Sequence, residues 1–285
     1  MSVVALSVVI PARDAASTLG AQLDALSVQQ VGEPWEVLVV DNGSRDGTVA
    51  LALEYADRLP LRVLTCDRPG PSAARNEGAA AAKGVLLAFC DADDVVADGW
   101  VEAMRIALAA SDAVGGAIEN DRLNPGPALV GRHPAGLPVA AGFLPRAITA
   151  NLGVRAEVWH RLGGLAEEYG YGAEDTEFCW RLQLAGYALT YAPDAVVHYR
   201  VRTTFRGASR KAYLHGVARA RLFRDYRAAG MPEPRLLGAT YRWARVVVAT
   251  PAVPFSRRLR WWWAQEAAAA WGRLVGSVRF RVRYL

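Results

Sequence analysis

Three carboxylates, Asp91, Asp93 and Asp94, directly follow an apolar run that begins at Val85. An unbroken apolar run of this length is typical of a strand that is buried on both faces of a sheet. Like charges placed this close together repel one another, so they need a cation or a polar ligand nearby. The pattern indicates a divalent cation held against a phosphorylated compound. It fits equally well an N-cap of the helix expected from Asp98, because Asp caps helices effectively.

Polar residues also follow the neighbouring apolar runs. Pro11 ends the first run, Asp41 ends the second, and Arg75 lies in the helix expected after the third. The carboxyl ends of parallel strands share one edge of the sheet, and open α/β sheets bind their ligands there. Turn and capping preferences explain each loop separately. They do not explain why Asp41, Arg75 and Asp91 should all fall on the ligand-binding edge.

Two further segments carry candidate functional groups. Glu174 and Asp175 begin a predicted helix after a glycine-rich loop, where acidic residues also favour the helix dipole. Tyr171 in that loop offers a ring that could stack on a ligand, although aromatic residues near helices are more often part of the core. His198 follows the last apolar run. A lone strand histidine is usually structural, but imidazole is also a ligand for Mn²⁺.

The apolar runs alternate with segments rich in Ala and Leu, which predicts βαβ units and a mostly parallel sheet. Residues 119–150 contain many Pro and Gly residues and predict a loop-rich connection. Helical patterning returns near Arg155–Leu162 and Asp175–Ala185, and a strand is expected through Ala195–Tyr199. The predicted strands are Leu6–Ile10, Val37–Val40, Leu61–Thr65, Val85–Phe89 and Ala113–Ile118. The predicted helices between them are Ala15–Gln29, Thr48–Asp57, Ser72–Ala82 and Asp98–Ala110.

The composition limits the cellular setting. Cys66, Cys90 and Cys179 are odd in number and far apart, which favours free thiols in a reducing compartment and excludes a zinc-site spacing. No basic region precedes the first apolar run, so a secretory signal is not expected. No stretch is long enough for a transmembrane helix. We therefore expect a cytoplasmic protein.

The charge is divided unevenly along the chain. Residues 200–285 carry 19 Arg and Lys against 3 Asp and Glu, a net charge of +16, whereas residues 1–199 carry −11. Arg and Trp alternate with aliphatic residues near Tyr241–Val248 and Arg257–Trp263, which suits an interfacial helix on the inner face of an anionic membrane. Packing on the acidic part of the chain, or between the subunits of a homo-oligomer, is the second interpretation. Nucleic-acid binding is the least favoured.

Four motifs, taken together and in this order, resemble the family 2 glycosyltransferases of the GT-A fold. They are Ser7–Pro11, Val39–Thr48, Ala73–Gly78 and Phe89–Asp94. The resemblance covers roughly residues 5–200, and it implies an α/β fold with a Rossmann-like, mostly parallel sheet flanked by helices. The chain contains neither a GxGxxG sequence nor a Walker loop, which disfavours dinucleotide-binding and P-loop interpretations.

The resemblance also implies how a nucleotide sugar would bind. Asp41 would accept a hydrogen bond from the base, and Pro11 with the backbone of Ala12 and Arg13 would form a wall beside it. Arg75 would contact the nucleotide, because a guanidinium can pair with a phosphate or a carboxylate in fork geometry.

The family's remaining roles fall on the acidic residues. Asp91 would hydrogen-bond the ribose, and Asp93 would bind the Mg²⁺ or Mn²⁺ that bridges the diphosphate, with His198 as a second metal ligand. Glu174 and Asp175 match the family's Glu-Asp motif, in which one acid is the general base, and Asp175 is preferred here. The part played by Asp94 is left open between a cap and an orienting group.

We therefore expect an inverting glycosyltransferase that uses a nucleoside-diphosphate sugar, with UDP favoured, and an acceptor hydroxyl of a cell-envelope glycan or glycolipid. Residues 1–203 would form the catalytic domain, with a donor half at about 1–118 and an acceptor half at about 119–203. Residues 204–285 would form a basic helical extension. A catalytically silent nucleotide-sugar-binding or scaffold protein is the alternative from another class. A nucleotidyltransferase is a weaker one, because the Gly- and Arg-rich loop it needs after the first strand is missing.

Overall fold

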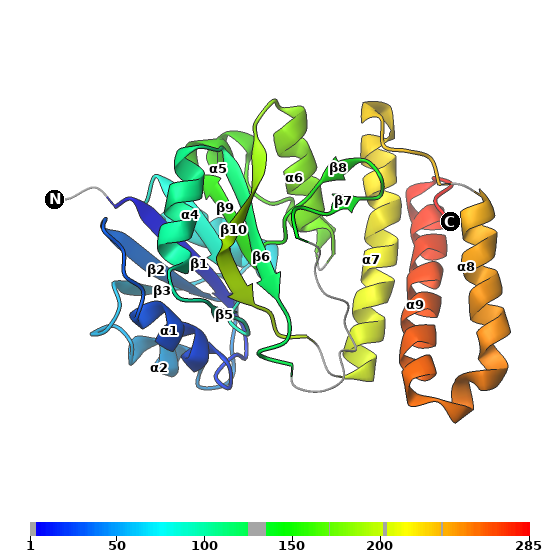
Figure 1. The fold of residues 1–285 in the computed structure, drawn as a ribbon, viewed down its shortest axis with the longest axis horizontal. Helices are drawn as coiled ribbons and strands as arrows, with labels where there is room; N and C mark the ends of the chain where they lie inside the picture. Colours follow the sequence, from blue (N-terminus) through cyan, green and yellow to red (C-terminus); the bar gives the residue numbers. More distant parts are fainter. Residues whose placement is uncertain (1–3, 125–134, 171, 202–203, 235) are drawn as a thin grey trace. The chain divides into compact units, whose positions relative to one another are not determined.

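The computed structural model describes residues 4–124, 135–170, 172–201, 204–234 and 236–285 (Figure 1). The chain forms two compact units. Of the described residues, the first unit contains 4–124, 135–138, 145–170 and 174–201, and the second contains 139–144, 172–173, 204–234 and 236–285. Each unit is described separately below.

The first unit alternates strands and helices as the sequence predicts. Its strands are β1 (Leu6–Ala12), β2 (Trp35–Asp41), β3 (Leu61–Thr65), β4 (Leu86–Cys90), β5 (Val95–Val96), β6 (Ala113–Glu119), β9 (Asn151–Arg155) and β10 (Leu189–His198). Its helices are α1 (Leu19–Ser27), α2 (Thr48–Leu53), α3 (Pro71–Ala81), α4 (Trp100–Ala109), α5 (Ala156–Leu162) and α6 (Glu174–Leu184), with a 3-10 turn, η1 (Glu167–Tyr169). A short hairpin, β7 (Val139–Ala140) and β8 (Leu144–Pro145), interrupts the predicted loop-rich segment, and its residues 139–144 belong to the second unit.

One eight-stranded sheet forms the centre of this unit, in the order β3-β2-β1-β4-β9-β6-β10-β5. Strands β1, β2, β3 and β4 run parallel to one another, and β10 runs parallel to β6. Strand β9 lies antiparallel between β4 and β6, and β5 lies antiparallel to β10. The mostly parallel sheet is confirmed, but strand β9 was not predicted.

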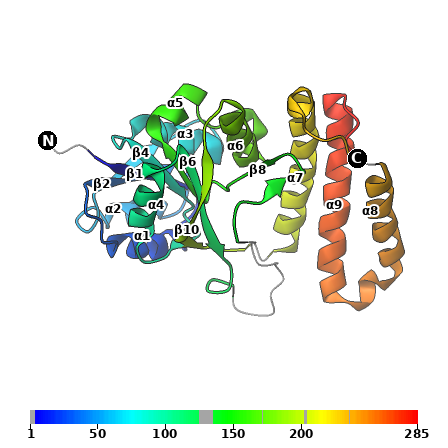
Figure 2. The ribbon, with the colours of Figure 1, turned by 45° about the horizontal axis from the view of Figure 1, so that its top comes forward.

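Helices cover both faces of the sheet (Figures 1 and 2). Along β1, Val8 and Ile10 pack toward α1, α2 and α4, whereas Val9 between them packs toward α3, α5 and α6. This alternation explains the continuous apolar runs, because a strand buried on both faces has no position for a solvated side chain. The free cysteines expected from the sequence are also found: Cys66, Cys90 and Cys179 are buried and unbridged.

Helix α3 lies unusually close to the sheet, and this contact positions Arg75. A Cβ at Gly78 would come within 2.4 Å of the Val9 side chain, so only glycine permits the observed approach. Arg75 lies one turn earlier on the same helix, near its N-terminal end. Close packing at Gly78 therefore holds the Arg75 side chain at the edge of the sheet where β1, β2 and β4 end.

The second unit is helical, as predicted for the C-terminal segment. Its helical elements are α7 (Phe205–Tyr226), η2 (Arg227–Ala229), α8 (Leu236–Ala249), η3 (Thr250–Phe255) and α9 (Arg257–Phe280). Helices α7 and α9 meet through small residues: a Cβ at Gly216 would lie 2.3 Å from the Ala269 carbonyl oxygen, and one at Gly272 would lie 2.1 Å from that of Tyr213. Within the described residues, no helix combines the length and the apolarity needed to cross a bilayer.

The clustered tryptophans of α9 take part in packing inside this unit. The Trp261 ring meets the Phe205 ring edge-on at 5.8 Å, and the Trp262 ring lies under the guanidinium of Arg245 at 4.8 Å. The indole nitrogen of Trp263 donates to the carbonyl oxygen of Val246 at 3.0 Å. These side chains are only partly exposed, so they are not a free apolar surface.

Candidate functional site

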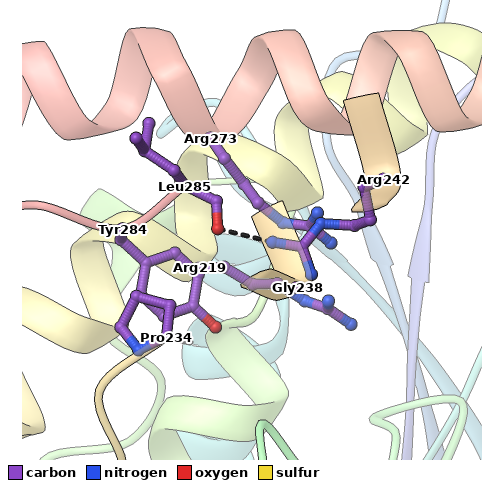
Figure 3. Close-up of a pocket in the computed structure, with 7 residues that line it drawn as sticks. All are labelled: Arg219, Pro234, Gly238, Arg242, Arg273, Tyr284 and Leu285. Carbon is purple, nitrogen blue, oxygen red and sulfur yellow. Dashed lines mark hydrogen bonds between the residues drawn. The ribbon is translucent and has the colours of Figure 1, made fainter. Parts of the chain in front are cut away.

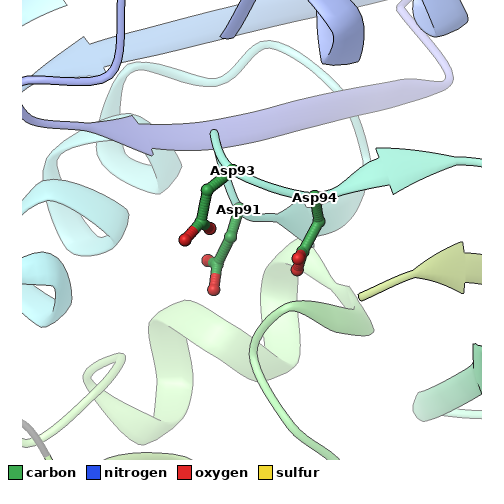
Figure 4. A group of neighbouring side chains, drawn as sticks. All are labelled: Asp91, Asp93 and Asp94. Carbon is green, nitrogen blue, oxygen red and sulfur yellow. The ribbon is translucent and has the colours of Figure 1, made fainter. Parts of the chain in front are cut away.

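The acidic loop after β4 brings three carboxylates together. One ligand oxygen from each of Asp91, Asp93 and Asp94 lies within 4.8 Å of the others, and the three side chains point to the same side of the loop (Figure 4). Asp94 is fully buried, Asp91 is half-buried and Asp93 is exposed. Three hard oxygen ligands with graded exposure suit a divalent cation such as Mg²⁺ or Mn²⁺, which binds carboxylates and keeps part of its water shell.

Asp94 has a definite structural role in this loop. Its Oδ1 accepts a hydrogen bond from the backbone N–H of Arg200 at 2.7 Å, and the Arg200 Nε donates to the carbonyl oxygen of Asp93 at 2.8 Å. The buried Oδ2 of Asp94 has no hydrogen-bond partner among the described residues. Burial, reinforced by the negative charge of Asp91, raises the pKa of Asp94 to about 9. An unpartnered buried oxygen in a cluster of like charges is what a cation would relieve, so the donor set fits a metal.

Arg75 supplies positive charge beside this cluster. Its Nη2 forms an ion pair with Oδ1 of Asp91, and the side chains are 4% and 27% exposed respectively. Burial by itself would lower the pKa of Arg75, but the charges of Asp91 and Glu174 outweigh it and raise the value. The Nε and Nη1 groups of Arg75 are buried without a partner. The N–H groups on these two nitrogens are therefore available to donate to the oxygens of a phosphorylated ligand.

Glu174 and Asp175 begin α6 on the same side of the sheet. Burial, followed by the charge of Asp175, raises the pKa of Glu174 to about 7, and Arg75 and Asp91 are close enough to contribute. Asp175 is held at both oxygens: Oδ1 accepts from the Thr176 N–H at 2.6 Å, and Oδ2 pairs with the Arg146 guanidinium at 3.1 Å. The structure therefore brings the Glu-Asp pair, Arg75 and the acidic loop into one electrostatic cluster.

The loops after β1 and β2 are joined to each other and to the loop after β3. Ala12 is paired with Asp41 in the parallel register, and the Asn42 N–H donates to the Ala12 carbonyl oxygen at 2.9 Å. The buried Asp41 caps its own turn, with the Ser44 N–H 3.2 Å from Oδ1. Pro11 is half-buried and Arg13 is exposed. The predicted base-binding residues therefore lie together at the carboxyl edge.

Asn42 is the residue that fixes these loops. Its amide nitrogen donates to the carbonyl oxygens of Cys66 and Arg68, and its Oδ1 accepts from the Gly70 N–H at 2.8 Å. Gly70 precedes the first turn of α3. The side chain thus ties the end of β2 to the start of the helix that carries Arg75.

His198 and Tyr171 are the remaining predicted site residues. His198 ends β10 opposite Val95, next to the acidic loop, but the three-carboxylate group does not include it. Its Nδ1 lies 2.6 Å from Oε2 of Glu119, and its Nε2 lies 3.0 Å from the Arg122 guanidinium. Both ring nitrogens are thus engaged by charged side chains, and a metal-ligand role for His198 stays a prediction. Tyr171 lies outside the described residues.

Arg146 and Glu119 are site residues that the sequence did not reveal. Arg146 comes from the Pro- and Gly-rich segment, and its contact with Asp175 joins residues that are 29 positions apart. Glu119 ends β6, and its pairing with His198 spans 79 positions. An isolated Arg or Glu in irregular sequence carries no periodic signal, so only the three-dimensional arrangement could have identified them.

Two protein-family models match this chain. The model of glycosyl transferase family 2 matches residues 7–145, and the model of glycosyl transferase family group 2 matches residues 140–278. The first interval contains the loops that carry Asp41, Arg75, Asp91 and Asp93. The second begins before Arg146 and includes the Glu-Asp pair at the start of α6.

Curated relatives agree with this assignment. Glycosyltransferase AglE of Haloferax volcanii is 32% identical over 67% of this chain and 65% of its own length. The pre-mycofactocin glycosyltransferase of Mycobacterium tuberculosis is 31% identical over 75% of this chain and 46% of its own length. The chain therefore spans less than two thirds of each of these relatives.

Solved structures resemble the fold at low sequence identity. The mannosyltransferase PcManGT from Pyrobaculum calidifontis, in complex with GDP-Man and Mn²⁺, superposes with a TM-score of 0.62 at 20% identity, covering 94% of this chain and 86% of its own. Residues 1–349 of S. aureus TarS in complex with UDP give a TM-score of 0.55 at 17% identity, covering 99% and 93%. The predicted GT-A-type fold is confirmed.

Proposed function

Because the chain belongs to glycosyl transferase family 2, we propose that it transfers a sugar from a nucleoside-diphosphate donor to an acceptor hydroxyl with inversion at the anomeric carbon. One observation carries the proposal. The three-carboxylate loop, the buried Arg75 and the Glu174–Asp175 pair come from separate segments and meet as one charged cluster. Catalytic residues 1–203 would divide into a donor half at about 1–118 and an acceptor half at about 119–203, with residues 204–285 as a basic extension.

The donor would lie across the carboxyl ends of β1, β2 and β4. Asp41 would accept from the base beside Pro11 and the backbone of Ala12 and Arg13, and Asp91 would bind the ribose. We favour a UDP sugar, because a carboxylate accepts readily from the uracil N–H. TarS, which shares the fold, is recorded with UDP, whereas PcManGT is recorded with GDP-Man. The donor base is therefore a question for a direct binding assay.

Asp175 would remove the proton from the acceptor hydroxyl as that oxygen attacks the anomeric carbon. Its contacts with Arg146 and Thr176 hold the carboxylate in one orientation, and orientation is a large part of the catalytic gain in such reactions. Glu174 would adjust the local charge and, with Arg75, orient the donor. Mg²⁺ or Mn²⁺ bound through Asp93, and with His198 as a further ligand, would neutralise the diphosphate as it leaves.

The acceptor is proposed to be a cell-envelope glycan or a lipid-linked glycan. The net charge of +16 in residues 200–285 supports a location on an anionic membrane surface at its cytoplasmic face. Exposed apolar side chains of α8 support its part in such a surface. There Leu237, Tyr241 and Val248 are 83%, 64% and 78% exposed at helical spacing, whereas Trp261, Trp262 and Trp263 of α9 are only partly exposed and take part in packing.

The proposal is tested with the full chain, a panel of UDP and GDP sugars, and Mn²⁺. Ligands that bind only the folded state raise its melting temperature, which identifies the donor before turnover is measured. Asp93→Asn removes a hard anionic oxygen and should abolish transfer and metal-dependent donor binding. Asp57→Asn, a change of the same kind at an exposed position, is the matched control. Full turnover by Asp93→Asn, or by the unaltered protein in EDTA, would refute the metal assignment.

A silent nucleotide-sugar-binding or scaffold protein is the competing function. It predicts donor stabilisation with Mn²⁺ but no release of nucleoside diphosphate with any acceptor. The intact Asp93 and the doubly held Asp175 favour the enzyme, because a binding protein has no need of an oriented base. Product analysis by NMR separates the two functions and also reports the anomeric configuration.

A further inference from the structure

The helical unit contains a pocket of about 190 Å³ that plays no part in the proposed sugar transfer. Its lining comes entirely from α7, α8, α9 and the segments that flank them (Figure 3). The residues that line it are Arg219, Pro234, Gly238, Arg242, Arg273, Tyr284 and Leu285. Three of the seven are arginines, one from each long helix, and Figure 3 shows their side chains converging on the same space.

Among the described residues, no Asp or Glu forms an ion pair with Arg219, Arg242 or Arg273, although other arginines of α7 are paired with Asp225. Arg242 donates to the main-chain oxygen of Leu285, which also lines the pocket, and the other N–H groups of the three guanidiniums can reach a further acceptor. Burial and the repulsion from Arg219 and Arg242 lower the pKa of Arg273 to about 10, and Tyr284 and Glu266 act in the opposite direction.

The wall of the pocket is held in place by specific contacts. Ser277 on α9 donates its hydroxyl to the Tyr284 carbonyl oxygen at 2.8 Å and accepts from the Tyr284 N–H at 3.1 Å. The Tyr284 side chain is buried, and its ring lies 5.3 Å from that of Phe223 on α7. The segment after α9 is thus fixed to two helices. The wall of the pocket is therefore a built feature, in which Arg242 and Arg273 are half-buried and Arg219 is exposed.

We propose that this pocket binds a phosphate group, either a monoester or a diphosphate. Guanidiniums pair with phosphate oxygens in fork geometry, and three of them around one space match a doubly charged anion better than a single carboxylate. A phosphate also reduces the repulsion that Arg219 and Arg242 exert on Arg273. The ligand can be a free phosphorylated compound or the headgroup of a lipid, because the exposed Leu237 and Tyr241 of α8 lie near Gly238 and Arg242 in sequence.

The test measures anion binding by the full chain in EDTA, so that metal-dependent donor binding does not contribute. Inorganic phosphate, pyrophosphate and glycerol phosphate are titrated by calorimetry at constant ionic strength. Arg273→Gln and Arg219→Gln should each weaken binding roughly tenfold or more, since a charge-assisted hydrogen bond is lost. Arg258→Gln removes an equal charge at an exposed position of α9 outside the pocket and should leave binding unchanged. Arg273→Lys, which keeps the charge, should fall between wild type and Arg273→Gln.

The source of the phosphate is distinguished by vesicles. The ligand is a lipid phosphate if the protein binds phosphatidic acid vesicles but not soluble phosphates, and if only the pocket variants lose vesicle binding. Binding of the soluble compounds with the same variant pattern identifies a free phosphate. If no anion binds, or if Arg258→Gln weakens binding as much as the pocket variants do, the pocket is not a phosphate site. Thermal melts of each variant show that a loss of binding is not a loss of folding.

Discussion

The ion pair between Arg75 and Asp91 offers the sharpest prediction, because its burial sets the size of the effect. The Arg75 side chain is only 4% exposed and Asp91 is 27% exposed. Breaking a buried pair by removing one partner typically costs about 3–5 kcal/mol, since the other charge is left without compensation. Because Asp91 is partly exposed, we expect Arg75→Gln to lower the free energy of unfolding by an amount at the lower end of this range, about 3 kcal/mol. For a unit of this size, that lowers the melting temperature by about 6–12 °C.

Arg68 provides the matched control for this measurement. It pairs with Glu77 and Glu167, but its side chain is 54% exposed. An exposed ion pair is worth about 0–1 kcal/mol, so Arg68→Gln should shift the melting temperature by no more than about 4 °C. Both variants are melted in EDTA, with urea unfolding as the second measurement. The double variant Arg75→Gln/Asp91→Asn should be more stable than the two single effects predict, with a coupling of about 1–3 kcal/mol.

Equal destabilisation by Arg75→Gln and Arg68→Gln would refute this reasoning. It would mean that water or another side chain compensates Asp91 in solution, and that Arg75 is not held as a buried cation. The proposed donor site would then lose its main fixed positive charge. A large effect on stability together with unchanged nucleotide affinity would separate the two roles and make Arg75 structural only.

Three further predictions follow from the same contacts. Asp175→Asn should lower turnover roughly 10²–10⁴-fold with donor affinity nearly intact, and an active Asp175→Asn beside an inactive Glu174→Gln would show that Glu174 is the base. Burial raises the pKa of Glu174 from 4.5 to about 7 in the folded state, so its contribution to stability is complete below pH 4.5 and is lost as the pH rises through about 7. Urea unfolding of Glu174→Gln across this pH range should therefore show a flatter pH dependence than wild type. Gly272→Ala should destabilise the helical unit by about 1–3 kcal/mol through its clash with the α7 backbone, whereas Gly238→Ala, with space for a Cβ, should be neutral or slightly stabilising in calorimetric melts.

Local patterns predicted the central strands and helices because each pattern reflects a local physical requirement. Strands buried on both faces must be apolar throughout, and helices α1 to α4 were predicted within a few residues of their observed ends. Strand β9 shows where this reasoning stops. Only Leu152 and Val154 are bulky apolar residues in it. Glycine is favoured at position 153 because a Cβ there would lie 2.8 Å from the Val114 side chain and 3.0 Å from that of Leu108. Its place between β4 and β6 is set by partners distant in sequence, which a single strand's pattern does not encode.

The site, too, contains residues that the sequence predicted and residues that it did not. Asp91, Asp93, Arg75 and Asp41 were predicted because strand ends in a parallel sheet share an edge, and the structure brings their loops together there. The contact of Arg146 with Asp175 depends on how an irregular segment returns to the sheet, so no periodicity announces it. The assignment of metal, base and nucleotide contacts to single residues remains a prediction that the variants above test.

The C-terminal tryptophans show why composition alone cannot distinguish a membrane face from a helix interface. Both environments favour a large apolar ring with one polar atom at its edge, so a run of Arg and Trp fits either. The distinction lies in where the indole N–H finds its acceptor. Trp263 donates to a backbone carbonyl of α8, which is a packing contact, whereas Leu237 and Tyr241 of α8 are 83% and 64% exposed. A membrane-binding test should therefore alter Leu237 and Tyr241, because changes to Trp263 would disturb the helical unit before they affected any surface.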